Sequence, residues 1–236
     1  MKLNSCLVCG GILAPSFKLE DLFSVAGLNK RLVCSTCWSK FEYLPQRVTC
    51  QGCGRWIDES LRERICPDCT RWLVNEKMDF NNVALFAYNL WMKEYMHRYK
   101  FIGDYRLRLI FTQFIKNYIR TNYPNRNLVV VPVPVAPETS ALRGFNQVQG
   151  LLEDVEYLEA LHTIDSKKTP QSAKNRFERM STSQPFALIQ GCEKQIYDKN
   201  VLIVDDVYTT GRTIRHAATA VLMANPRKIM GLTLAR

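Results

Sequence analysis

Long apolar segments and histidines are both scarce in this chain of 236 residues. No stretch reaches the roughly 18 uncharged apolar residues that a membrane helix needs. The opening residues, MKLNSCLVCGG, also lack the apolar run of a secretion signal. We therefore expect a cytoplasmic protein without membrane insertion. The three histidines, His97, His162 and His216, show no metal-ligand spacing, and we assign none of them a catalytic role.

The chain has fewer acidic than basic side chains. It contains 22 Asp and Glu and 32 Lys and Arg, which gives a formal net charge of +10. Part of the excess lies between residues 93 and 126, in a stretch whose apolar spacing predicts mostly helix. Clustered basic side chains beside aromatic ones suit single-stranded nucleic acid, in which phosphates pair and bases stack. A solvated helix face with its aromatics in the core is the plain alternative. The candidate nucleic-acid-binding residues are Lys93, Lys100, Arg106 and Arg108, and on a regular helix Lys93, His97 and Lys100 share one face.

Cysteine, in contrast, is abundant, and eight of the nine cysteines form four C-x2-C pairs within the first 70 residues. Each pair turns the chain so that two sulfurs face one ion, and two pairs complete a tetrahedral site of four thiolates. Soft thiolate ligands in a closed geometry favour structural zinc, because no position stays open for catalysis. The predicted ligands are Cys6, Cys9, Cys34, Cys37, Cys50, Cys53, Cys66 and Cys69.

The pairing of these cysteines has alternatives. Joining the first pair with the second and the third with the fourth closes each loop locally, and we prefer the two tandem zinc ribbons that result. Interleaved pairing and an iron–sulfur centre stay open. A disulfide framework is disfavoured in a chain without a secretion signal. Cys192 stands alone, and we expect it to pack rather than to react.

The chain divides into two parts by composition. Residues 1–77 hold the cysteine pairs, and we expect a zinc-binding module that needs its metals to fold. Residues 78–236 alternate apolar runs with helical periodicities, which predicts an α/β domain with a mainly parallel sheet. The expected strands are 83–88, 128–131, 201–204 and 229–234, and the expected helices lie at 107–119 and 214–222.

The sharpest motif is VLIVDDVYTTGRT at residues 201–213. It predicts a buried strand that delivers two carboxylates at its C-terminal end, then a loop of small hydroxyl residues and a new helix. Loop amides and a helix N-terminus offer N–H donors to a phosphate, and Gly211 permits close approach. Asp205 and Asp206 suit the hydroxyls of a sugar, or a Mg²⁺ ion that accompanies pyrophosphate. An ordinary strand–loop–helix junction with capping threonines is the plain alternative.

This motif resembles the phosphoribosyl-pyrophosphate motif of the type I phosphoribosyltransferases at all 13 positions. The resemblance implies their fold, a phosphoribosyl pyrophosphate ligand with Mg²⁺, and displacement of pyrophosphate from the sugar. It also implies that Asp205 and Asp206 hold the ribose hydroxyls and belong to the catalytic group. The implied phosphoribosyl-binding residues are Asp205, Asp206, Thr209, Thr210, Gly211, Arg212 and Thr213.

Further stretches indicate which family with this motif the chain resembles most. VPVP at 131–134 and RGFNQ at 143–147 are similar to the ComF family, which joins an N-terminal zinc ribbon to a phosphoribosyltransferase domain. Less specific matching positions are Tyr99, Lys100, Phe101, Gly103, Asp104, Gln171, Arg179 and Phe186. The resemblance implies a role in DNA uptake during natural transformation, at the inner face of the membrane, beside a helicase-like competence protein.

The loop between Pro134 and Arg143 departs from the family pattern. It reads VAPETSAL, where the family carries basic residues that face the pyrophosphate. Arg143 is the remaining candidate for a catalytic cation, and a surface arginine beside a turn is its alternative. Two functions follow: a competence-type protein that binds a phosphoribosyl ligand and single-stranded DNA, or an active Mg²⁺-dependent transferase of nucleotide salvage or biosynthesis. A zinc-ribbon regulator is disfavoured, because no recognition helix is evident.

Overall fold

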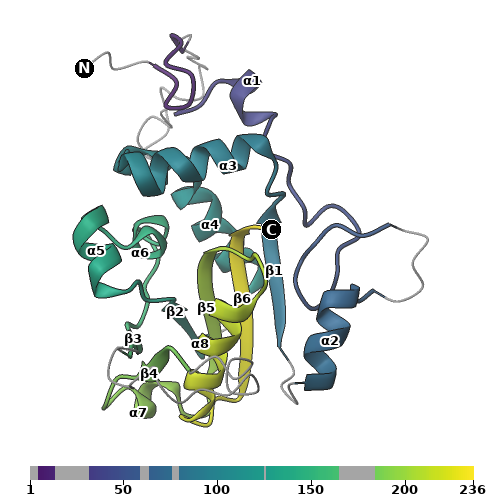
Figure 1. Ribbon diagram of the computed structural model, residues 1–236, viewed down its shortest axis with the longest axis vertical. Helices are drawn as coiled ribbons and strands as arrows, with labels where there is room; N and C mark the ends of the chain where they lie inside the picture. Colours follow the sequence, from purple (N-terminus) through teal and green to yellow (C-terminus); the bar gives the residue numbers. More distant parts are fainter. Residues whose placement is uncertain (1–4, 14–31, 59–63, 76–79, 125, 165–183) are drawn as a thin grey trace, which may run out of the picture.

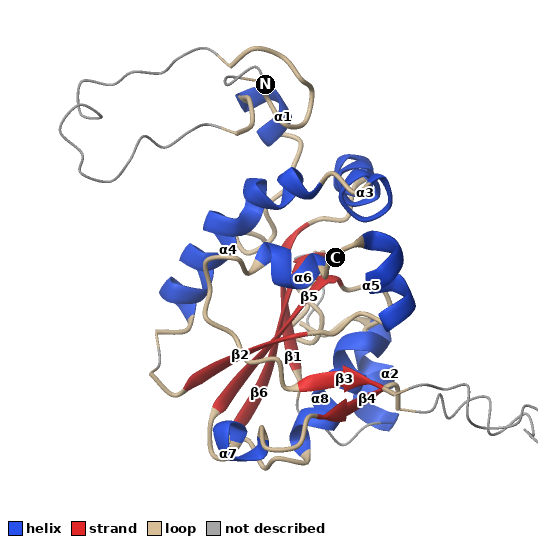
Figure 2. Cartoon of the chain, turned by 90° about the vertical axis from the view of Figure 1, so that its left-hand side faces the viewer, coloured by secondary structure: helices blue, strands red, loops and turns tan. Residues whose placement is uncertain are grey.

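The computed structural model describes residues 5–13, 32–58, 64–75, 80–124, 126–164 and 184–236 (Figure 1). Gln171 and Arg179 of the family pattern lie outside these residues. A four-stranded sheet forms the centre, and helices lie on both of its faces (Figure 2). Among the described residues, no helix combines the length and the apolar character needed to cross a membrane.

All four strands of the central sheet run parallel, in the order β1-β6-β5-β2. Each overlaps one of the strands that the apolar runs predict, so the α/β class with a parallel sheet is confirmed. A separate antiparallel pair is formed by β3 and β4. The bounds are β1 Asn81–Phe86, β2 Leu128–Pro132, β3 Leu161–Thr163, β4 Phe186–Leu188, β5 Asn200–Val207 and β6 Lys228–Ala235.

Both predicted helices are confirmed. α4 (Leu109–Asn122) and α8 (Arg212–Leu222) each bury one apolar face and leave the other to solvent. A short 3-10 turn, Tyr105–Arg108, precedes α4. The other helices around the sheet are α3 (Leu90–His97), α5 (Pro137–Arg143), α6 (Gln147–Leu151) and α7 (Glu193–Ile196).

Strand β5 is buried on both faces because its side chains alternate between two apolar cores. Val201 and Ile203 pack in the core that contains α8, whereas Leu202 and Val204 pack in the core that contains α3 and α4. An uninterrupted apolar run is what a strand covered on both sides requires. The strand therefore brings the residues that follow this run into the middle of the molecule.

The prediction that Lys93, His97 and Lys100 share one helix face is wrong. A π-helix, Arg98–Ile102, follows α3 and ends at Gly103 in the left-handed conformation. Lys93 and His97 are exposed, whereas Lys100 turns inward and its ammonium group reaches a carboxylate of β5. The common basic face expected for a regular helix is therefore not formed. π-helical turns occur frequently at functional sites.

The eight paired cysteines come together as two groups of four, and the tandem pairing is confirmed. Within each group all four sulfurs lie within 4.8 Å of one another. The Cys9 and Cys34 sulfurs are 3.9 Å apart, and the Cys53 and Cys66 sulfurs are 3.7 Å apart. Two sulfurs on a tetrahedral zinc with bonds of about 2.3 Å lie about 3.8 Å apart. Both groups therefore fit zinc, and all nine cysteines are free of disulfide bonds.

The two cysteine units lie at different places around the sheet (Figure 1). The first unit contains Cys6, Cys9, Cys34, Cys37 and helix α1 (Ser35–Trp38), and it lies near α3. The second unit contains Cys50, Cys53, Cys66, Cys69 and helix α2 (Pro67–Asn75), and it lies near β1. The four cysteines of the second unit are buried in the same core as α8. Contacts thus cross the predicted boundary between residues 1–77 and 78–236.

We predict that the purified protein holds about two Zn²⁺ ions per chain, since two separate groups of four thiolates are present. Cys53→Ser should reduce the content to about one ion, as measured by elemental analysis. Cys192→Ser is the matched control and should keep both ions, because Cys192 belongs to neither group. A content of one ion in the unmodified protein would contradict the two-site arrangement.

Candidate functional site

Two adjacent carboxylates lie near the C-terminal end of β5. Asp205 and Asp206 are only 7% and 5% exposed. The neighbours of β5 are β6, reached through α8, and β2, which precedes it along the chain. In an open parallel sheet, ligands bind beyond the carboxyl ends of the strands, where the strand order reverses. The acidic pair therefore lies where this fold binds its ligands.

The charges of this pair are only partly compensated. The Lys100 Nζ atom lies 2.6 Å from Asp206 Oδ2, which pairs one of the two carboxylates. The backbone N–H of Asp206 donates to Asp205 Oδ1 at 2.9 Å. Burial, and next the charge of Asp206, raise the pKa of Asp205 to about 7. A carboxylate in this state gains stability from hydroxyl donors or from a cation that arrives with a ligand.

The loop after β5 offers hydroxyl groups and peptide amides. Thr209, Thr210 and Thr213 are exposed, so their hydroxyls are accessible. Gly211 has a φ of 85°, and a Cβ at this position would collide with the ring of Tyr208. Helix α8 begins at Arg212, and its first amides and dipole favour an anion. The loop is suited to hold a phosphate group.

The VPVP and RGFNQ stretches form the neighbouring wall. Asn146 caps α6, because its side-chain oxygen accepts from the Val148 N–H at 2.8 Å. The Tyr99 hydroxyl donates to the Gln147 carbonyl at 2.9 Å, which joins this wall to the π-helix. A cavity of about 200 Å³ follows the end of β2, and Pro132, Pro134 and Asn146 are among its lining residues. The family motifs thus build the edge of the sheet next to the acidic pair.

Arg143, the predicted catalytic cation, lies on this wall. Its guanidinium donates to the Gln147 side chain, and it lies 5.8 Å from the centre of the Phe101 ring. Arg143 is half-buried, and Phe101 is exposed. Arg143 therefore packs against the π-helix that also carries Lys100, which brings two cations to one element of the site.

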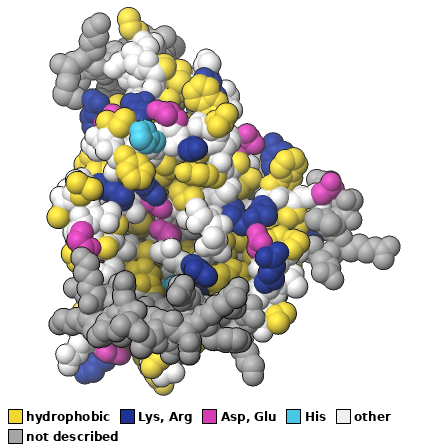
Figure 3. Space-filling model, viewed as in Figure 1, with side chains coloured by type: hydrophobic (Ala, Val, Ile, Leu, Met, Phe, Trp, Pro, Cys, Tyr) yellow, Lys and Arg dark blue, Asp and Glu magenta, His cyan; other side chains and the backbone are white. Residues whose placement is uncertain are grey.

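Three of the four predicted nucleic-acid residues pair with carboxylates in the structure. Lys100 pairs with Asp206, Arg106 with Asp104 at 2.9 Å, and Arg108 with Glu153 at 2.8 Å. On the face seen in Figure 3, basic side chains form several small groups that apolar side chains separate. Lys93 and Arg106 are the exposed members of the predicted set.

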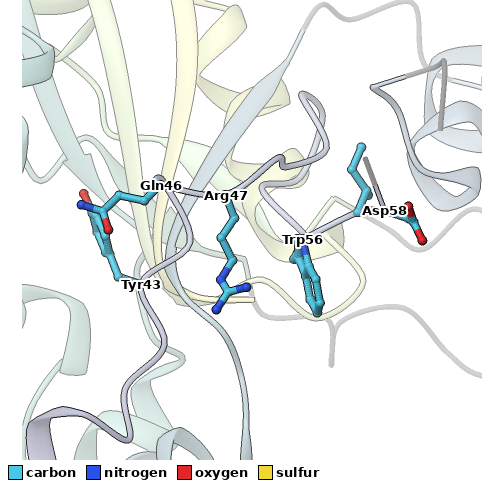
Figure 4. A pocket seen from close by; sticks show the side chains of 6 residues that line it. Tyr43, Gln46, Arg47, Trp56 and Asp58 are labelled. Atoms are coloured by element: carbon cyan, nitrogen blue, oxygen red, sulfur yellow. The ribbon is translucent and has the colours of Figure 1, made fainter. Parts of the chain in front are cut away.

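A wide groove lies away from these residues, on the segment that leads into the second cysteine unit. Its volume is about 1010 Å³, and its lining residues are Tyr43, Gln46, Arg47, Trp56, Ile57 and Asp58 (Figure 4). The Arg47 guanidinium lies 5.2 Å from the Trp56 ring centre. None of the lining residues belongs to the β5 loop, so this groove is separate from the acidic pair.

Several contacts between residues at the site are not predicted by the sequence. The sequence assigns Lys100 to nucleic acid, whereas its partnership with Asp206 depends on the π-helical turn. Two further residues contact the β5 loop, Trp72 through its indole N–H and Arg236 through its guanidinium. The position of Lys100 within the family pattern is the one signal in the sequence that points toward the site.

We predict that Asp205→Asn stabilises the free protein at pH 8. The raised pKa means that ionised Asp205 is disfavoured in the folded state, so this cost is present above pH 7 and declines as the pH falls. Asparagine removes the charge and can still accept from the Asp206 N–H. The melting temperature should rise by about 2–4 °C per kcal/mol gained, and by less at pH 5. An equal or opposite change at the two pH values would contradict a buried, ionisable Asp205.

Comparison with known proteins agrees with this arrangement. A family model described as the phosphoribosyl transferase domain matches residues 106–236. Competence protein ComFC of Streptococcus pneumoniae is 33% identical, and the alignment covers 98% of this chain and 99% of that protein. Competence protein ComFC of Bacillus subtilis is 29% identical, over 92% of this chain and 88% of that protein.

One solved structure, of an allosteric regulatory enzyme of purine biosynthesis, matches 52% of this chain and 25% of that chain, at 14% identity and a TM-score of 0.32. The two full-length relatives and the domain match confirm the predicted ComF resemblance. The chain belongs to the family of the ComFC proteins and carries a phosphoribosyl transferase domain.

Proposed function

We propose that this protein acts in DNA uptake during natural transformation and binds a phosphoribosyl ligand of the phosphoribosyl pyrophosphate type together with Mg²⁺. The observation that carries the ligand is the buried pair Asp205 and Asp206, followed directly by the exposed hydroxyls of the loop. The carboxylates would accept from the ribose hydroxyls, and Thr209 to Thr213 would donate to the 5′-phosphate. The role in competence rests on similarity to the two ComFC proteins along most of the chain.

Single-stranded DNA and a helicase-like competence protein are the proposed macromolecular partners. The excess of Lys and Arg over Asp and Glu, 32 against 22, favours a polyanion through counterion release. Lys93 and Trp91 are exposed on α3, Phe101 is exposed on the π-helix that follows, and Arg106 is exposed on the 3-10 turn before α4. Aromatic rings and basic side chains together suit stacked bases with their phosphates.

Phosphoribosyl transfer is the second candidate function, because the acidic pair and the loop are both present. Departure of pyrophosphate needs positive charge close to the leaving group. The stretch 135–142 contains Glu138 and no Lys or Arg, and Arg143 is held by Gln147. We therefore favour binding over turnover.

For the ligand, we predict that titration calorimetry with phosphoribosyl pyrophosphate and Mg²⁺ detects binding by the unmodified protein. Asp205→Asn with Asp206→Asn should weaken it at least about tenfold, since each missing charge-assisted hydrogen bond is worth roughly 1.5–3 kcal/mol. Asp198→Asn is the matched control, because Asp198 is exposed and asparagine tolerates its positive φ of 53°. Failure of the unmodified protein to bind would remove the ligand assignment.

For DNA, we predict that changing the two exposed candidates, Lys93 and Arg106, together to Gln weakens binding of single-stranded oligonucleotides. A plot of log K against log salt should become less steep by about 0.7 for each phosphate that the protein no longer neutralises. The matched control changes two exposed basic residues near the opposite end of the strands, Arg126 and Lys228. Equal weakening in both variants would point to net charge alone and would overturn the proposed surface.

For turnover, we predict no pyrophosphate release above background when the protein is given phosphoribosyl pyrophosphate, Mg²⁺ and a panel of purine and pyrimidine bases. The physical reason is the lack of cations in residues 135–142. An enzyme-coupled pyrophosphate assay measures this. Release that disappears in Asp205→Asn would instead establish an active transferase.

A further inference from the structure

The second cysteine unit contacts the backbone of the β5 loop directly. The indole N–H of Trp72, on α2, donates to the Thr210 carbonyl at 3.1 Å. The guanidinium of Arg236 donates to the Tyr208 carbonyl at 3.1 Å and to the Thr209 carbonyl at 2.5 Å. Three successive carbonyls of the loop are thus held from outside the loop. Because a peptide unit is planar, holding its carbonyl also sets the direction of the N–H of the next residue.

Metal ligands set the position of α2. The helix spans Pro67–Asn75, so it starts between Cys66 and Cys69, and its own Cys69 is one of the four sulfur donors. Asp68 lies in the first turn, and its carboxylate is 4.0 Å from the guanidinium of Arg236. Trp72 follows Cys69 by three residues on the same helix. A change in the cysteine group would therefore move Trp72 directly, and it would move the Asp68 carboxylate that lies beside Arg236.

The unit is also fixed firmly to the sheet. The Asn82 N–H donates to the Gly52 carbonyl at 3.3 Å, and its side-chain amide donates to the Cys53 carbonyl at 3.2 Å. The same amide bonds Thr233 of β6 at 3.0 Å. Gly54 lies so close to the backbone of Ala84 that no side chain would fit. The cysteine group, the sheet and the loop are therefore parts of one packed body.

A buried cation completes this contact. Arg215 of α8 is 2% exposed, and its guanidinium lies 5.0 Å from the Trp72 ring centre and 5.4 Å from that of Phe80. Burial raises the pKa of the Tyr208 hydroxyl to about 12, and the charge of Arg215 acts in the opposite direction. Trp72 is thus packed between the loop and the helix that follows the loop.

We propose that Trp72 and Arg236 are positioning residues through which the zinc-loaded second cysteine unit holds the phosphate loop in its binding conformation. The part of this inference that concerns ligand affinity rests on the proposed ligand function. A loop that is already held loses less conformational entropy when a phosphate binds, so affinity is higher. The metal stays outside the ligand site and acts on it only through α2.

The first cysteine unit contacts a different element from the second. Its Leu7 and Val8 carbonyls, between Cys6 and Cys9, accept from the Arg98 guanidinium at 3.1 and 2.7 Å. Arg98 also pairs with Asp104 at 3.4 Å. In the described part of the first unit, residues 5–13 and 32–38, these contacts go to the π-helix and none goes to the phosphate loop, so loss of this unit should leave the loop amides unchanged.

The test compares Trp72→Phe with Trp56→Phe in the full-length, zinc-loaded protein. Trp72→Phe should speed hydrogen exchange of the amides at 208–211 by about tenfold. It should also weaken phosphoribosyl pyrophosphate binding by about five- to tenfold, as expected for the removal of one hydrogen bond. Trp56→Phe should change neither quantity, because Trp56 belongs to the same cysteine unit but is exposed and contacts Arg47 instead. A second comparison, Cys53→Ser against Cys9→Ser, should speed loop exchange in the first variant only.

The two readouts separate this inference from the proposed function. Faster loop exchange in Trp72→Phe, in a protein that binds no phosphoribosyl pyrophosphate, would support the positioning role and overturn the ligand. Unchanged exchange at 208–211 in Trp72→Phe would overturn the positioning role, whatever the ligand affinity. Should Cys53→Ser fail to fold, Trp72→Phe decides the question alone, because it leaves all eight metal ligands in place.

Discussion

The burial of two adjacent carboxylates on the central strand is the constraint on which the rest of this structure depends. Taking charged groups out of water costs several kcal/mol per ion unless partners compensate. Asp206 obtains such a partner in Lys100, at 2.6 Å, whereas the raised pKa of Asp205 shows that its charge is poorly compensated. The protein keeps this unfavourable pair at the edge of a parallel sheet, where a ligand with hydroxyl groups and a cation would relieve it.

The surrounding elements are arranged to hold that edge. The π-helix brings Lys100 onto Asp206, and the first cysteine unit holds the π-helix through Arg98. On the other side, the second cysteine unit holds the phosphate loop through Trp72. Four-thiolate sites suit this work because they are rigid and closed. The two cysteine units thus contact different elements beside the acidic pair, the first the π-helix and the second the loop after β5.

Much of this could be predicted from local patterns. The run Val201–Val204 identified a strand buried on both faces, and the C-x2-C spacing identified both metal groups, because these features depend on neighbours in sequence. The partner of Asp206 could not be predicted, since a regular helix would place Lys100 beside Lys93. The contact of Trp72 with Thr210 joins residues 138 positions apart and depends on how α2 docks. Local periodicity carries no information on such docking, and it left Arg236 unnoticed.

The central claim is that the acidic pair and the following loop together hold a ribose 5-phosphate group. A crystal structure of the protein with phosphoribosyl pyrophosphate and Mg²⁺ tests it most directly. We expect density for the 5′-phosphate against the amides and hydroxyls of Thr209 to Thr213, with the ribose hydroxyls on Asp205 and Asp206. Ligand bound elsewhere, with the Lys100–Asp206 pair intact and the loop empty, would contradict it.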